Sequence, residues 1–362
     1  MTSLQPEQSL LTQEESTAIR GVLIFLIVLG HCQYFTDITS RWEVMGYLYL
    51  FHVKCFFLLP FLYPLKSLTW QRATDLLIRC YVPFLLFLLG FFLYRWGTGQ
   101  IHVALWFLPA SLFAGGGRVL FRLTGLRVLW FLPALFATLL LKEGWQRSRT
   151  IPRICLLAIG FLEILWALYC ANLPQNAAIW LRRINFWSFY VQIALCYLPI
   201  GLLLRWALLS KRFSCPFFLV VFLLCTVMYF YHTFAVTMIR YPVNRMSSMR
   251  QFLSYLATPA FLALLYFSRA TFARASWLRL LGQHSLLIYL MHPLLGHIFY
   301  AARFRIPLPS WFWVLPTTLL CCVIPLLISY YLDRLPCVRA LLIPRSWQEW
   351  KNAICSSRFS PT

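Results

Sequence analysis

Residues 19–31 read IRGVLIFLIVLGH, in which ten apolar or glycine residues separate an arginine from a histidine. An α-helix rises about 1.5 Å per residue, so this spacing places Arg20 and His31 roughly 16 Å apart, or about three turns. Eleven steps of about 100° exceed three full turns by only about 20°, so both side chains lie on nearly the same face. The stretch predicts an apolar helix over 19–36 around which the rest of the chain is organised.

A histidine about half-way through an apolar helix is the first candidate for catalysis. An ionisable side chain is costly in hydrocarbon, so in membrane proteins it usually faces a water-filled cavity or the bundle interior. The alternative is that His31 only donates a hydrogen bond to a neighbouring helix, and that Arg20 extends to the lipid head groups. The two residues by themselves leave both interpretations open.

The composition indicates a polytopic membrane protein. Hydrophobic residues make up 61% of the 362 residues and charged residues 12%, and the mean hydropathy is +0.71. Soluble domains contain about half apolar and about a quarter charged residues. The net charge of +22 comes from Lys and Arg spread over nearly every predicted loop, without a basic domain. This distribution argues against nucleic acid and favours anionic lipids and phosphorylated ligands as partners.

The cysteines and the N-terminal segment add two expectations. None of the 12 cysteines forms a Cys-x-x-Cys pair, and most lie in apolar runs. We expect buried reduced thiols, with neither a metal site nor a disulfide framework. Residues 1–17 are polar and acidic without a basic start, so they are not expected to be a cleavable signal peptide.

Apolar windows of about 18 to 20 residues predict an all-α fold with about ten transmembrane helices. These spans lie near 19–36, 46–64, 77–95, 127–141, 153–171, 185–206, 216–236, 251–268, 283–301 and 311–332. The stretch 101–114 ends in three glycines and is predicted to be a short re-entrant or surface helix. Its sequence LWFLPA recurs at 129–134, where a helix is expected to continue from it.

The basic residues predict the orientation. Ten spans with both termini in the cytoplasm place the excess of Lys and Arg inside, whereas an eleventh span over 101–114 reverses that excess. We therefore expect a multi-pass protein of the cell membrane with three parts. These are a polar cytoplasmic segment (1–18), a membrane domain (19–332) and a basic cytoplasmic tail (333–362).

Four stretches resemble the membrane-bound acyltransferase 3 family, which consists of integral-membrane O-acyltransferases of envelope sugars. Residues 20–31 are similar to its Arg-x10-His signature. Three further stretches follow in the family's order, namely YLFHVKCFFL at 49–58, LWFLPALF at 129–136 and SLLIYLMHPL at 285–294. One departure is FLLPFLYP at 57–64, where the family usually has Phe-x-x-Ser-Gly. This change concerns the acceptor specificity more than the fold.

The resemblance implies that the acyl donor is acetyl-CoA or another acyl-CoA, without a metal. RCYVP at 79–83 is similar to the Arg-x-x-Ile-Pro of the family's third span. Guanidinium groups bind phosphate bidentately, so Arg79 and Arg72 are the candidate cofactor-binding residues. The alternative is that these arginines only hold the ends of helices at the membrane surface.

Transfer of an acyl group from a thioester to a hydroxyl needs a base for the hydroxyl proton and a cation or hydrogen-bond donor near the thioester oxygen. His31 is the candidate base, because a histidine titrates near neutral pH. Arg20 is the second candidate catalytic residue and would bind the phosphate or pantetheine end of the donor. A covalent acyl-enzyme on His31 or on a serine is an alternative mechanism, although no Gly-x-Ser-x-Gly motif is present.

Four other polar residues in the spans are candidate substrate-binding residues, namely His52, Lys54, Glu163 and His292. Lys54 and Glu163 are isolated charges, which either pair with each other or line the path of the acceptor. A structural role is the stronger interpretation for Glu163. Pro293 interrupts its span, so His292 either faces a cavity or caps the kink.

The sequence therefore favours an O-acyltransferase, with acetyl as the expected group, acting on a hydroxyl of an envelope glycan, glycolipid or lipid-linked sugar. The competing hypothesis is a transporter or flippase of a lipid-linked saccharide. Transporters are commonly built from two related halves, and no second Arg-x10-His occurs in 180–362. The sequence is also compatible with a homodimer.

Overall fold

The computed structural model describes residues 9–35, 46–64, 68–101, 120, 123–124, 128–172, 189–239, 243–303 and 310–356. Within these ranges the chain forms helices and turns and no strand. The helices, with η for 3-10 helices, are α1 (Gln13–Phe35), α3 (Cys55–Leu58), η1 (Leu59–Leu62), α4 (Trp70–Gly97), η2 (Val128–Trp130), α7 (Phe131–Arg147), α8 (Thr150–Asn172), α10 (Phe189–Leu209), α11 (Cys215–Ile239), α12 (Val243–Phe267), α13 (Arg269–Arg274), α14 (Ser276–Gln283), α15 (Ser285–Arg303), η3 (Ser310–Trp313), α16 (Val314–Asp333), α17 (Pro336–Leu342) and α18 (Trp347–Ser356). The all-α prediction is confirmed for the described residues.

Seven of these helical stretches are long and apolar enough to cross a membrane, namely α1, α4, η2 with α7, α8, α10, α11 and α16. They match seven of the ten expected spans. The described part of α15, Ser285–Phe299, is a shorter apolar helix, and α12 is helical where another span was expected. The predicted count of about ten is therefore not reached among the described residues. The predicted surface helix 101–114 lies almost entirely outside them.

The expected span over 46–64 is not a continuous helix. The described residues turn repeatedly at 49–54 and then form only α3 and η1. Pro60 cannot donate a backbone hydrogen bond, and the amides of Leu50 and Phe51 bond carbonyls only three residues back. Irregular backbone is tolerated at membrane depth where protein surrounds it. The segment is enclosed in this way, because His52, Cys55 and most of their neighbours are buried.

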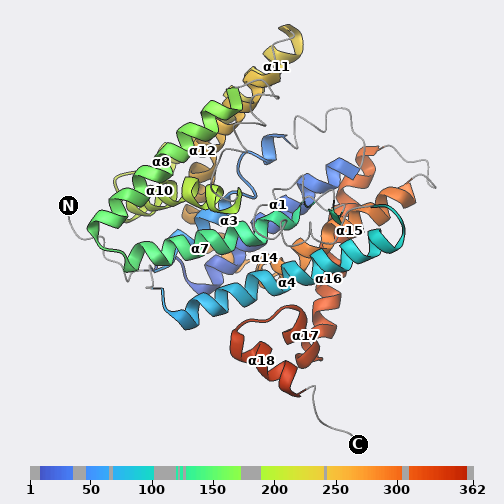
Figure 1. Cartoon of the computed structure of the whole chain (residues 1–362). Coiled ribbons are helices and arrows are strands. Elements are labelled where there is room, and N and C mark those ends of the chain that lie inside the picture. The colour runs from blue at the N-terminus through green and yellow to red at the C-terminus, as the bar shows by residue number, and fades with distance from the viewer. Residues whose placement is uncertain are drawn as a thin grey trace, which may run out of the picture.

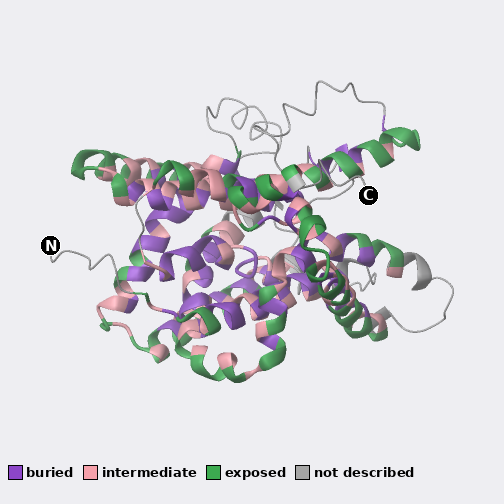
Figure 2. Ribbon diagram, turned by 90° about the horizontal axis from the view of Figure 1, so that it is seen from below, coloured by how far each residue is buried: buried purple, intermediate pink, exposed green. Residues whose placement is uncertain are grey.

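Helix α1 lies in the middle of the bundle (Figure 1). It packs against α13, α14, α15 and α16, and Ile19, Leu23 and Ile27 on it are fully buried. On the other side of the molecule, α10 packs against α7 and α8, and α11 packs against α12. Buried residues concentrate in the middle of the molecule, while the peripheral helices are largely exposed (Figure 2). The predicted central place of this first apolar stretch holds over its described residues, which end at Phe35.

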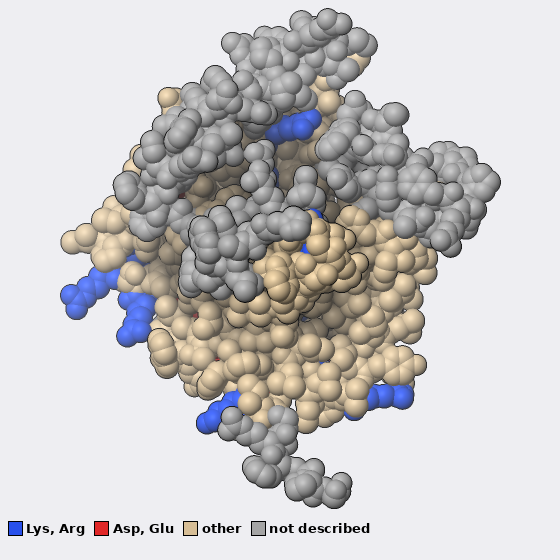
Figure 3. Space-filling view, turned by 45° about the vertical axis from the view of Figure 1, so that its right-hand side comes forward, with Lys and Arg blue, Asp and Glu red and all other residues tan. Residues whose placement is uncertain are grey.

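The outer helices present an apolar surface. Helix α8 exposes Phe161, Leu162 and Leu165, and α11 exposes Leu223 and Val227. The face in Figure 3 is almost uncharged over its described part, with Lys and Arg in a few places mostly near its edge. Such a surface is costly in water and suited to lipid, which agrees with the apolar composition.

A capping box and two ion pairs stabilise the start of α1. Thr12 and Glu15 form a capping box, in which the Glu15 carboxylate accepts from the Thr12 amide at 2.8 Å and the Thr12 hydroxyl accepts from the Glu15 amide at 3.2 Å. Two ion pairs tie the same turn to the segment of α13 and α14, Arg269 with Glu15 at 3.2 Å and Arg279 with Glu14 at 3.1 Å. The entry of α1 is therefore fixed relative to α14.

The expected basic tail contains structure. Helices α17 and α18 follow α16 and both contact α4. The backbone amide of Trp347 donates to the Asp75 carboxylate on α4 at 2.9 Å, and Arg339 forms ion pairs with Asp333 and Glu349. The described tail, up to residue 356, is thus packed against the start of α4 (Figure 1).

Candidate functional site

His31 on α1 has its two ring nitrogens in different environments. Nδ1 lies 2.8 Å from the carbonyl oxygen of Ile27, one turn earlier. A carbonyl oxygen only accepts, so Nδ1 carries the proton and Nε2 keeps its lone pair. The hydroxyl of Tyr49 lies 2.6 Å from this Nε2 and donates to it. His31 is therefore arranged as a neutral imidazole whose Nε2 can accept a proton.

Two further histidines, far apart in sequence, repeat this arrangement. His52 Nδ1 contacts the carbonyl of Leu48, and His292 Nδ1 lies 3.1 Å from the carbonyl of Ile288. Both residues are almost completely buried. By the same argument each presents an unprotonated Nε2, and that of His52 has no hydrogen-bond partner among the described residues.

The three imidazoles and Tyr49 form one cluster, which we call the histidine centre and define as His31, Tyr49, His52 and His292. The rings of His31 and His292 are 4.8 Å apart between centroids, and those of Tyr49 and His52 are 4.9 Å apart. His292 Nε2 lies 3.3 Å from His31 Nδ1. The structure thus brings together three of the predicted site residues. Tyr49 was missed, although its position three residues before His52 was a usable signal.

The histidine centre is suited to proton transfer from an alcohol. The Tyr49 hydroxyl occupies the position that a second hydroxyl group would need in order to give its proton to His31 Nε2. His31 itself is half-buried, whereas His52 and His292 are not exposed. Tyr49 is half-buried as well, so access to the centre is greatest at His31 and Tyr49.

Arg20 lies near the start of α1, as the spacing predicted, and well away from the histidine centre. Its Nη2 donates to the Thr17 hydroxyl at 3.0 Å, while its Nε is buried without a hydrogen-bond partner in the described part of the chain. It is close enough to Tyr63 and Arg79 to interact with them electrostatically. Two neighbouring guanidinium groups favour an anion between them, so Arg20 and Arg79 together form a candidate phosphate site.

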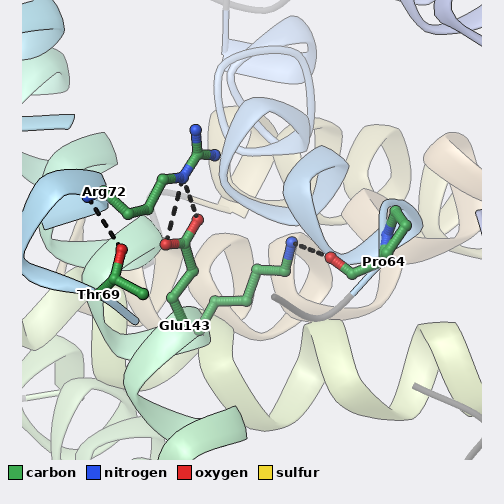
Figure 4. Close-up of polar contacts among 5 residues, drawn as sticks. Pro64, Thr69, Arg72 and Glu143 are labelled. Atoms are coloured by element: carbon green, nitrogen blue, oxygen red, sulfur yellow. Dashed lines mark hydrogen bonds and ion pairs between the residues drawn. The ribbon is translucent and has the colours of Figure 1, made fainter. Parts of the chain in front are cut away.

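Arg72 has a partner within the protein (Figure 4). Its Nε lies 3.0 and 3.3 Å from the two carboxylate oxygens of Glu143 on α7, a residue that is almost fully buried. Lys142 donates to the carbonyl of Pro64 at 3.3 Å. The sequence predicted neither contact. Both are structural, because Arg72 joins α4 to α7 and Lys142 joins α7 to the residues that follow η1.

Lys54 and Glu163 do not pair with each other. The ion pair that the sequence analysis gave as one alternative for these two charges is therefore wrong. Lys54 Nζ donates to the hydroxyl of Ser254 on α12, which in turn donates to the Leu50 carbonyl at 2.8 Å. Glu163 accepts from the Gln192 amide at 3.0 Å. Each charge therefore has a neutral hydrogen-bonding partner, Lys54 beside the histidine centre and Glu163 between α8 and α10.

Taken together, the fold and the site define a class: an all-helical membrane protein with a cluster of imidazoles around its central helix and two arginines, Arg20 and Arg79, near the N-terminal part of that helix. Comparison with known families shows which family of this class the chain belongs to. A family model described as an acyltransferase domain, that of the acyltransferase 3 family, matches residues 14–330. The chain belongs to the acyltransferase 3 family and is a membrane acyltransferase. No curated protein and no solved structure matches it.

Proposed function

We propose that this protein is an O-acyltransferase that moves an acyl group, most simply acetyl, from cytoplasmic acyl-CoA to a hydroxyl of an envelope glycan, glycolipid or lipid-linked sugar. The observation that carries the proposal is the hydroxyl of Tyr49 at 2.6 Å from His31 Nε2. It supports a centre in which the acceptor hydroxyl takes the place of the tyrosine hydroxyl.

The proposed reaction begins when the acceptor O–H gives its proton to His31 Nε2 as its oxygen attacks the thioester carbon. A tetrahedral intermediate forms and then collapses with cleavage of the C–S bond. The thiolate leaves and takes the proton from His31, which returns the imidazole to its neutral form. One ester forms and one thioester is lost, so no further reactant is required.

The donor is proposed to extend along α1 from its N-terminal part. Arg20 and Arg79 would bind the phosphates of acyl-CoA, because the two positive guanidinium groups lie close enough to repel each other and an anion between them would offset that repulsion. The pantetheine arm would then cover the three turns of α1 that separate Arg20 from His31. In this arrangement both termini lie in the cytoplasm, and Lys54 and His52 border the acceptor.

The test is acyl transfer by purified protein in nanodiscs. Wild type and His31→Ala would be incubated with radiolabelled acetyl-CoA and a panel of glycans and glycolipids, and labelled ester and free CoA would be measured. A general base contributes about 10²- to 10⁴-fold, so His31→Ala should lose at least about 100-fold in kcat.

His232→Ala provides a matched control, because His232 lies on α11, outside the histidine centre. It should keep the wild-type rate. Unchanged transfer by His31→Ala would remove His31 from the mechanism. Movement of intact saccharide across the membrane without consumption of thioester would instead identify a transporter.

A further inference from the structure

His292 on α15 contacts the candidate base on the side away from Tyr49. Its Nε2 lies 3.3 Å from His31 Nδ1, and its side chain is only 1% exposed. His31 Nδ1–H therefore has two acceptors, the Ile27 carbonyl at 2.8 Å and the His292 ring. His31 Nε2, on the opposite edge of the ring, faces Tyr49.

The orientation of His292 is itself fixed by the backbone of α15. Its Nδ1 lies 3.1 Å from the Ile288 carbonyl. Pro293 has no N–H, so the carbonyl of Tyr289 lacks its usual helical donor, and this carbonyl also interacts with the His292 ring. The Ile288 carbonyl at Nδ1 places the lone pair of His292 on Nε2, which faces His31.

We propose that His292 is a positioning residue for His31, a role distinct from the substrate-binding role expected from the sequence. It accepts the hydrogen bond from His31 Nδ1–H, which holds Nε2 of His31 in the proton-accepting form and orientation. This inference rests on the proposed role of His31 as the base.

The same contact stabilises the charge that forms during the reaction. When His31 takes the acceptor proton at Nε2, it becomes an imidazolium with a proton on each nitrogen. Its hydrogen bond to His292 Nε2 then becomes charge-assisted and stronger. A neutral imidazole partner avoids burying an additional negative charge in the bilayer, which a carboxylate in this position would do. The stabilisation therefore appears mainly in the transition state and affects kcat.

The two nitrogens of His292 can be tested separately with amide side chains. Asparagine places a polar atom near the position of Nδ1, and glutamine places one near the position of Nε2. His292→Gln can still accept from His31, whereas His292→Asn can only satisfy the Ile288 carbonyl. His292→Leu can do neither. All three variants would be measured for kcat, for KM of acetyl-CoA and acceptor, and for thermal unfolding in nanodiscs.

The proposal predicts that His292→Gln keeps kcat within about fivefold, while His292→Asn and His292→Leu lose about 10- to 100-fold in kcat with little change in KM. If His292→Asn retained activity and His292→Gln did not, the only role of the ring would be its hydrogen bond to the backbone of α15. If KM for the acceptor rose in all three variants and kcat stayed constant, His292 would contact the substrate. Either result would overturn the proposal.

A double-mutant cycle decides the question even if His292→Gln does not fold. Because His292 acts through His31, His292→Leu should cause no further loss in residual transfer in the His31→Ala background. Independent, additive losses would overturn the positioning role while leaving His31 as the base. Full activity of His31→Ala alone would instead remove His31 as the base, on which this proposal rests, so the two failures are distinguishable.

Discussion

At the scale of single residues, the histidine centre shows how ionisable side chains can be buried at low cost. Each of the three imidazoles satisfies its N–H with a carbonyl one turn earlier, so no net charge is needed inside the bilayer. The neutral form that is cheapest to bury is also the form that a general base requires. Stability and reactivity therefore favour the same protonation state.

Tyr49→Phe tests whether the tyrosine hydroxyl occupies the position of the acceptor. The substitution removes the hydroxyl that donates to His31 Nε2 and keeps the ring that packs beside His52. An acceptor would no longer have to displace a hydrogen bond, so its KM should fall about 2- to 10-fold. Steady-state kinetics with varied acceptor would measure this. A loss of kcat of about 100-fold would show instead that Tyr49 passes the proton to His31.

Arg72 and Arg79 lie on the same helix and should respond differently to removal of the side chain. Arg72→Ala leaves the buried Glu143 carboxylate without its ion pair, so the free energy of unfolding should fall by about 1–3 kcal/mol. Arg79→Ala should raise the KM for acyl-CoA and leave the unfolding temperature unchanged.

Glu143→Gln supplies the control for the Arg72 prediction. In the Arg72→Ala background it removes the uncompensated charge, so the lost stability should return. Thermal unfolding and acyl-CoA titrations of the same preparations would separate the two roles. If acyl-CoA affinity is weaker in Arg72→Ala and stays weaker after Glu143→Gln, Arg72 binds the cofactor.

At the scale of elements, α1 and α14 approach each other closely through their backbones. A Cβ atom on Gly21 would lie 1.9 Å from the Leu278 carbonyl oxygen, and one on Gly282 would lie 1.7 Å from the Thr17 carbonyl oxygen. The two backbones approach through one glycine from each helix, in the manner of small-residue contacts in membrane proteins. This contact and the ion pair at Glu14 position α1 relative to α14, and the ion pair at Glu15 positions it relative to α13.

Gly282→Ala should therefore lower the free energy of unfolding by at least about 1–3 kcal/mol, because the new methyl group meets backbone atoms that cannot rotate away. Gly90→Ala on α4 is the matched control, since no atom of the described residues lies within 4 Å of the added Cβ, and it should be neutral or slightly stabilising. Thermal unfolding in one detergent measures both. Equal unfolding temperatures for the two variants would contradict the close contact.

At the scale of the whole molecule, the long apolar helices were predictable because length and hydropathy are local properties. The segment 46–64 was not, since an apolar stretch enclosed by protein has the same composition as one that crosses lipid. The position of His31 within a central apolar helix was also predictable, because it depends only on the local sequence of α1. Its contact with His292, 261 residues away, and the contact of Lys54 with Ser254, 200 residues away, depend on how α12 and α15 pack.

The proposed reaction requires one continuous path along α1, from the guanidinium groups of Arg20 and Arg79 to the histidine centre. An electron cryo-microscopy structure with a non-hydrolysable acyl-CoA analogue tests this path most directly. We expect phosphate density at Arg20 and Arg79 and the thioester-equivalent carbon within about 6 Å of His31 Nε2, the reach of one bridging hydroxyl. Density for the acyl group on the lipid side of α8 or α11, or at any place separated from His31 by packed side chains, would contradict it.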